Sequence, residues 1–142
     1  MLYEEMSELK DVVELLKKTK SFKEKLEHIN SERILYSSFS KKQSRAKGKI
    51  GPIPARVAIF LKDHEYFLEV HKESWITASE GERLYIILHE LYHIPIDGFN
   101  KESAEYKKVN LHDLEDFKIL VNTFGVDLEN ADKLVKIVEN EE

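Results

Sequence analysis

The spacing of apolar residues along the chain predicts several amphipathic helices and two short strands. Apolar residues that recur every third or fourth position indicate a helix, and strict alternation indicates a half-buried strand. The predicted helices cover residues 2–18, with Phe22, Leu26 and Ile29 extending the first pattern, and residues 80–94, 111–124 and 128–138; the predicted strands cover residues 33–39 and 65–71. Thr77 or Ser79 can cap the helix over 80–94, and Pro95 ends it.

Between these elements the pattern is weaker. Residues 40–49 carry five cations and no acid, which predicts a basic loop. Residues 51–54, Gly-Pro-Ile-Pro, are expected to break any regular element, and residues 55–61 fit a helix or a strand equally well. The predicted fold class is therefore α+β. A small mixed sheet, with strand 65–71 at or near its edge, packs on helix 80–94, and the following helix closes the site.

Length and composition limit the possible classes of protein. The 142 residues predict a single domain over 1–142, with an N-terminal helical segment (1–30), a core (31–125) and a C-terminal helix (126–142). The absence of cysteine excludes disulfides, thiolate zinc sites and a cysteine nucleophile. No apolar run is long enough to span a membrane, and the acidic start differs from a secretory signal, so we expect a cytoplasmic protein. The net charge of −5 disfavours a dedicated nucleic-acid binder.

The sequence His-Glu-Leu-Tyr-His at 89–93 is an HExxH motif within the strongest predicted helix. Residues four apart on a helix share one face, so His89 and His93 can bind the same tetrahedral Zn²⁺. Glu90 lies beside them, where it can act as general base toward a water activated by the metal. Without that function, the motif would be a chance histidine pair on a helix surface, or a core histidine next to a glutamate.

A catalytic zinc site needs a third protein ligand and an open position. His112 is the best candidate, because a helix that starts near residue 111 can fold back beside the motif. The acids that follow it could replace it as ligand or orient an imidazole by accepting its free N–H; these are Asp113, Glu115 and Asp116. Glu102 and Glu105 are weaker alternatives. Without a metal, the acids after residue 111 would stabilise a helix N-terminus.

A peptidase must also bind its substrate and stabilise the developing oxyanion. Strand 65–71 directly precedes the motif helix, which makes it the candidate for main-chain pairing with an extended peptide. Arg45, Tyr92, Tyr106 and Lys49 are possible oxyanion donors. Tyr92 ranks low among them, because it should face away from the two histidines.

Residues 34–120 resemble the small zinc metallopeptidases of archaea and phages, which are distantly similar to SprT-like and minimal gluzincin enzymes. The resemblance is carried by Leu88–Pro95, which is close to the pattern HELLHIP, by Ser44–Ile50 and by His112–Phe117. It implies Zn²⁺ at His89 and His93, Glu90 as base and His112 as third ligand. It also favours Arg45 among the possible oxyanion donors.

The predicted function is a zinc-dependent metallopeptidase that hydrolyses peptide or protein substrates. The alternative is a non-catalytic or regulatory zinc-binding module. Such a module would contact nucleic acid or a single protein partner through the basic loop 41–49. A solvated, flexible loop would explain the same cations without any partner.

Overall fold

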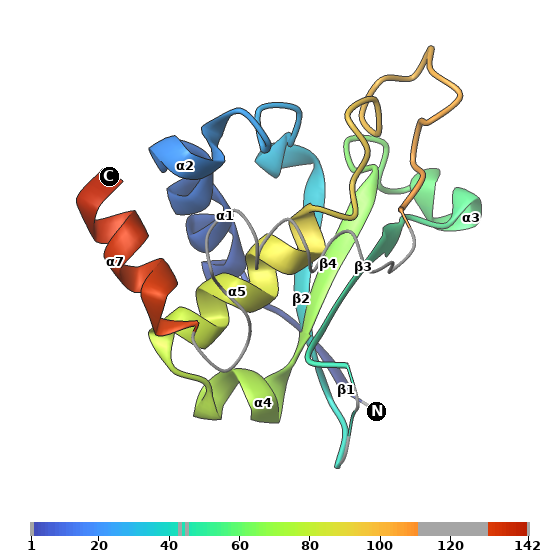
Figure 1. The fold of residues 1–142 in the computed structure, drawn as a ribbon. Coiled ribbons are helices and arrows are strands. Elements are labelled where there is room, and N and C mark those ends of the chain that lie inside the picture. Colours follow the sequence, from blue (N-terminus) through green and yellow to red (C-terminus); the bar gives the residue numbers. More distant parts are fainter. Residues whose placement is uncertain (1, 43, 45, 111–130, 142) are drawn as a thin grey trace.

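The computed structural model describes residues 2–42, 44, 46–110 and 131–141, and shows helices packed against a four-stranded sheet (Figure 1). The strands are β1 (Leu2–Glu5), β2 (Ile34–Ser40), β3 (Gly48–Pro52) and β4 (Tyr66–His71). The helices are α1 (Glu8–Lys18), α2 (Lys20–Lys23), the 3₁₀ turn η1 (Ser31–Arg33), α3 (Ala55–Ala58), α4 (Lys72–Thr77), α5 (Glu80–Leu91) and α7 (Asp132–Glu141). Among these helices, none is long and apolar enough to cross a bilayer.

The sheet is mixed, with the strand order β1-β2-β4-β3. The two central strands, β2 and β4, run parallel, whereas β1 and β3 flank them antiparallel. Strand 65–71 is confirmed as β4, and it lies near the edge of the sheet as predicted, although it is not the edge strand itself. The segment that takes the edge beside it is β3, whose glycines and Pro52 conceal its strand character in the sequence.

Helices cover one side of this sheet. α1, α2, α5 and α7 all lie on that side in Figure 1, with α5 between the sheet and α7. The buried residues of β4, Tyr66, Leu68 and Val70, point into this core, as their alternation predicts. Leu84, Ile87, Leu88 and Leu91 of α5 are almost completely buried and form the other half of it. Burial of this apolar surface holds the motif helix against the sheet.

The N-terminal prediction needs a correction. Residues 2–5 form strand β1 instead of the first turn of a helix, and α1 begins only at Glu8. The apolar spacing is compatible with a helix, but Leu2 is 62% exposed and contributes little to the core. Backbone pairing with Ser37–Ser40 of β2 decides the conformation instead. That partner lies more than thirty residues away, so local periodicity does not show it.

Other boundaries also differ from the predictions. Residues 51–52 continue β3 rather than breaking the structure, and residues 55–58 form a short helix. The motif helix ends at Leu91, three residues before the predicted end. Its start is confirmed, because Ser79 and Glu82 form a reciprocal capping box. The last helix begins at Asp132, and the helix predicted over 111–124 lies outside the described residues.

Candidate metal centre

The HExxH motif lies at the C-terminal end of α5. His89 and Glu90 belong to the last turn, and His93 lies just beyond the helix end. The chain keeps a tight turn there, because the backbone N–H of His93 donates to the carbonyl of Glu90 at 3.1 Å. Although the helix ends before His93, both histidines lie on the same side of α5.

The two imidazoles are spaced as zinc ligands would be. Their Nε2 atoms lie 3.4 Å apart, and both side chains are buried, at 8% and 2% exposure for His89 and His93. Two nitrogens bound to one tetrahedral Zn²⁺, each at about 2.0–2.1 Å, are themselves about 3.4 Å apart. The two nitrogens are therefore already at the separation that a shared zinc ion requires.

The orientation of each imidazole is set by a neighbour. Nδ1 of His93 donates to the backbone carbonyl of Asn110 at 2.7 Å, which leaves the Nε2 lone pair of a neutral ring for a metal. The ring of Tyr85 stacks on His89, with centroids 6.0 Å apart and planes inclined by 17°. Sequence reasoning missed both contacts. Tyr85 lies four residues before His89, so helical spacing could have found it; a backbone carbonyl leaves no such signal.

Glu90 is buried beside the histidines, with 5% of its surface exposed. Burial raises the pKa of its carboxyl to about 7, although the backbone N–H of Ile50 donates to it and opposes this rise. Among the described residues, no cation forms an ion pair with it. A metal ion on the adjacent imidazoles would favour the charged carboxylate.

Strand β3 presents its outer edge to Glu90. The backbone N–H of His71 donates to the carbonyl of Lys47, and that of Ile53 donates to the carbonyl of Glu65, both at 2.9 Å. The backbone N–H and carbonyl groups of the odd-numbered residues of this segment therefore point toward β4. The backbone groups of Gly48 and Ile50 consequently point to the unpaired edge. A Cβ atom on Gly48 would lie 3.3 Å from Cγ of Glu90, so a side chain at this position would make the approach of the strand to the Glu90 side chain tight.

The remaining predicted site residues are placed differently. His112, Asp113, Glu115, Asp116 and Arg45 lie outside the described residues. Within the described part of the chain, no group of three His, Cys, Asp or Glu side chains could hold a metal.

Tyr106, predicted as an oxyanion or substrate group, is placed in another part of the molecule. It interacts with Arg33 and Glu65, which form an ion pair at the start of β2 and β4.

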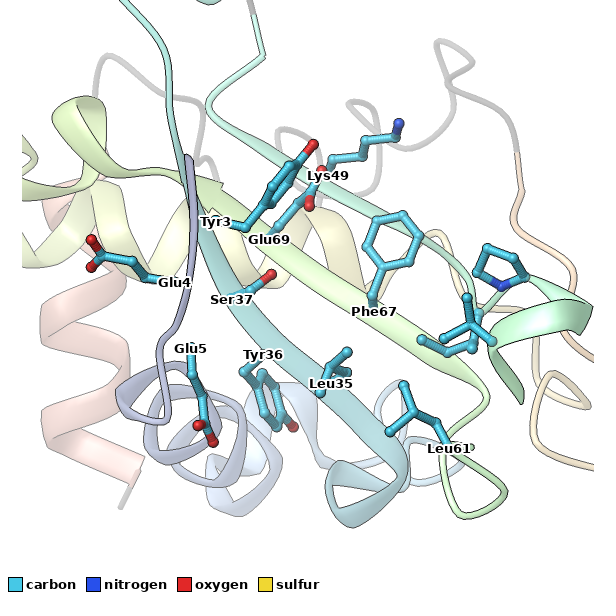
Figure 2. Close-up of a pocket in the computed structure, with 13 residues that line it drawn as sticks. Tyr3, Glu4, Glu5, Leu35, Tyr36, Ser37, Lys49, Leu61, Phe67 and Glu69 are labelled. Atoms are coloured by element: carbon cyan, nitrogen blue, oxygen red, sulfur yellow. The ribbon is translucent and has the colours of Figure 1, made fainter. Parts of the chain in front are cut away.

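A separate hollow of about 600 Å³ lies on the other face of the sheet (Figure 2). Phe67 and Glu69 of β4 project into it, together with Lys49 of β3, whose Nζ lies 6.0 Å from the Phe67 ring centroid. None of the motif residues lines this hollow. Among the described residues, the motif therefore lies on the helical side of the sheet, away from this hollow.

The α+β fold, with its mixed sheet and HExxH helix, is that of a small zincin-like metallopeptidase. A comparison with family models agrees, since residues 1–139 match the model described as "Putative phage metallopeptidase". The chain belongs to this family of metal-dependent peptidases, which act on peptide or protein substrates. The match extends beyond the region 34–120 on which the resemblance rested. Comparisons with curated proteins and with solved structures found no match.

Proposed function

We propose that this protein is a zinc-dependent peptidase in which His89 and His93 bind the metal and Glu90 is the general base. The observation that carries the proposal is the placement of a buried carboxylate, with no partner cation among the described residues, beside two imidazole nitrogens 3.4 Å apart. Buried carboxylates without compensation are expensive to maintain, and they are concentrated at functional sites.

His112 is the proposed third ligand. The chain is fixed to the site just before it, because Asn110 accepts from Nδ1 of His93 and donates its own N–H to the His93 carbonyl at 2.7 Å. Two residues extend at most about 7 Å, so the length of chain after Asn110 allows His112 to serve as a ligand. Asp113 is the nearest substitute, and Glu115 and Asp116 are the further candidates for a ligand or for orienting an imidazole.

The chemistry divides between the metal and the carboxylate. When bound, zinc acts as a Lewis acid, which makes a water nucleophilic at neutral pH and polarises the scissile carbonyl. Glu90 accepts the proton of the attacking water and transfers it to the departing amine. The Ile50 N–H holds the carboxylate at the strand edge, where an attacking water can reach it.

The substrate strand pairs with β3 in this proposal. β1 and β3 are the outer strands of the described sheet, and of these β3 lies against Glu90. The outward N–H and carbonyl of Gly48 and the outward carbonyl of Ile50 are suited to main-chain hydrogen bonds with an extended peptide, while the Ile50 N–H is donated to Glu90. β4, the strand favoured by sequence, has a partner on each side and offers no such edge.

The test is the zinc content of the purified protein, measured by mass spectrometry after zinc reconstitution. We expect about one zinc ion per chain, because both histidines of the motif bind the same ion. The variants His93→Ala and His112→Ala should lose most of it. The control is His64→Ala, which changes a histidine in the turn before β4, among residues of η1 and β2.

Each outcome decides an assignment. Full zinc in His112→Ala would overturn His112 as a ligand and leave a carboxylate in its place. Full zinc in His93→Ala, or no zinc in the wild type, would overturn the metal centre. Loss of zinc in His64→Ala to the same extent would show that misfolding, not ligand removal, explains the other losses.

A further inference from the structure

The segment that joins β2 to β3 is rich in lysine, and the name lysine-rich turn is used for its described residues, Lys41, Lys42, Ser44, Ala46 and Lys47. Lys41, Lys42 and Lys47 are exposed, and none of them is in an ion pair with another described residue. Glu73 lies at the base of the turn, and its carboxylate is already bonded by the Ser40 hydroxyl and lies 3.1 Å from Nε2 of His71. The positive charge of the turn is therefore available to a ligand.

His71 holds both ends of this turn. Its Nε2 donates to the carbonyl of Lys41 at 2.7 Å, and its backbone N–H donates to the carbonyl of Lys47 at 2.9 Å. The Ser74 hydroxyl lies 2.6 Å from Nδ1 and completes the bonding of the ring. Because the ring is also buried, at 4% exposure, the base of the turn has a fixed position at the start of β3.

The lysine-rich turn lies at the N-terminal end of β3, the strand whose outer edge is proposed to bind the substrate. A Cβ atom on Gly48 would contact Ile86 and Glu90, and the backbone N–H of Ile50 donates to Glu90. From Gly48 to Ile50, β3 therefore runs in the same direction along the site as α5 does from Ile86 to Glu90. A peptide that adds antiparallel to β3 therefore passes Ile50 first and Gly48 later. Its residues after the scissile bond continue toward the lysine-rich turn.

We propose that the lysine-rich turn selects substrates with acidic residues on the C-terminal side of the scissile bond. This inference rests on the proposed function, because it takes the bond to be cleaved at Glu90. From Ile50 to Lys47 the strand advances about 10 Å, so the selected acids are roughly the second to fourth residues after the cleaved bond. The pairing is electrostatic and weakens as salt screens it.

At the other end of β3, the described segment after the motif has no comparable excess of charge. The segment after the motif carries Asp97, Glu102 and Glu105 together with Lys101, Lys107 and Lys108, so its charges balance. Lys107 also donates to the carbonyl of Ile53 and is partly engaged in that contact. The chain as a whole has a net charge of −5, which repels an acidic peptide elsewhere. The asymmetry gives the substrate both a preferred charge and a direction.

The experiment compares three peptide libraries with the same randomised centre. One has a glutamate block after the centre, one a glutamine block after it, and one a glutamate block before it. Cleavage by the zinc-loaded enzyme is followed by mass spectrometry. Binding of the fluorescein-labelled libraries to zinc-loaded Glu90→Gln protein is followed by anisotropy, which reads the preference without hydrolysis.

The charge-reversal variant is Lys42→Glu/Lys47→Glu. Its control, Lys20→Glu/Lys23→Glu, makes the same change in net charge on α2, which lies at the opposite end of the molecule from the turn (Figure 1). We expect the wild type and the control to prefer the glutamate block after the centre by roughly five- to tenfold, in cleavage and in binding, and the charge-reversal variant to lose this preference.

Equal cleavage and binding of the glutamate and glutamine libraries would overturn the inference while leaving the peptidase proposal intact. A preference for glutamate before the centre would overturn the antiparallel direction on which the inference depends. If no library is cleaved, the proposed function fails, and the anisotropy result still decides the charge preference. Tighter, more salt-sensitive binding of duplex DNA at the same turn would assign it to nucleic acid instead.

Discussion

The two buried carboxylates Glu65 and Glu90 differ in how the surrounding residues compensate their negative charge. Glu65, just before β4, is 1% exposed and forms an ion pair with Arg33 that uses both carboxylate oxygens; the Arg33 Nη2 bond is 2.7 Å. Glu90 is 5% exposed and receives the N–H of Ile50, but no cation in the described part of the chain pairs with it. Arg33 compensates the first charge, whereas no cation among the described residues compensates the second.

This difference separates a structural role from a chemical one. A buried ion pair with two hydrogen bonds offsets its own desolvation, and it fixes the start of β2 beside the start of β4. A buried carboxylate without a cation destabilises the fold and is retained where the reaction needs it. Glu65 should therefore matter for stability, and Glu90 for activity.

Glu90→Gln should give the largest effect. The amide still accepts the Ile50 N–H but cannot take a proton from the attacking water, so we expect hydrolysis to fall by roughly 10²–10⁴-fold. Zinc content should not change. The thermal midpoint of the metal-free protein should rise at pH 8, because an uncompensated buried charge is removed.

The control for this variant is Glu80→Gln, which changes an exposed acid in the first turn of the same helix and should keep full activity. Peptide cleavage, zinc analysis and thermal melts measure the three quantities. Normal hydrolysis by Glu90→Gln would contradict the assignment of the base.

Glu65→Gln should show the opposite pattern. Arg33 would stay partly buried without its countercharge, and since its side chain is 26% exposed we expect a loss of about 2–3 kcal/mol in the free energy of unfolding. Urea denaturation measures this loss, and the zinc content of the folded protein should remain that of the wild type.

The matched control is Glu4→Gln, which breaks the exposed pair with Lys72 and should cost less than about 1 kcal/mol. If both variants lose the same stability, burial does not distinguish these two pairs, and the comparison with Glu90 fails.

The sequence predicted the motif helix well because its signals are local. The apolar face of residues 84–91, the capping box at Ser79 and the histidine spacing all lie within one element, and the structure confirms the helix. The alternating strand 65–71 succeeded for the same reason. The α+β class followed from these elements together.

The strand that lines the site could not be predicted in the same way. β3 contains Gly48, Gly51 and Pro52, which are poor strand formers, and it is a strand because it pairs with β4. The carbonyl of Asn110 on His93 is likewise a contact of the folded backbone. Long-range pairing and backbone acceptors leave no pattern in a single sequence, whereas glycine in a strand does suggest a close approach.

Gly48 provides the smallest and most specific test of this close approach. A methyl group there would lie 3.0 Å from Cγ2 of Ile86 and 3.3 Å from Cγ of Glu90, so Gly48→Ala should displace the carboxylate by a few tenths of an ångström. We expect kcat to fall by about tenfold, since small errors in the position of a catalytic group are costly. KM and zinc content should stay close to the wild type.

Gly51→Ala is the matched control, because its added methyl meets the ring of Phe67, at 2.6 Å from Cζ, on the face with the hollow (Figure 2). That ring can rotate or shift, so this variant should lose some stability and keep its kcat. Steady-state kinetics on one cleaved peptide separates the two results. Equal losses of kcat would mean that any disturbance of β3 reduces activity, and an unchanged kcat in Gly48→Ala would show that the strand does not position Glu90.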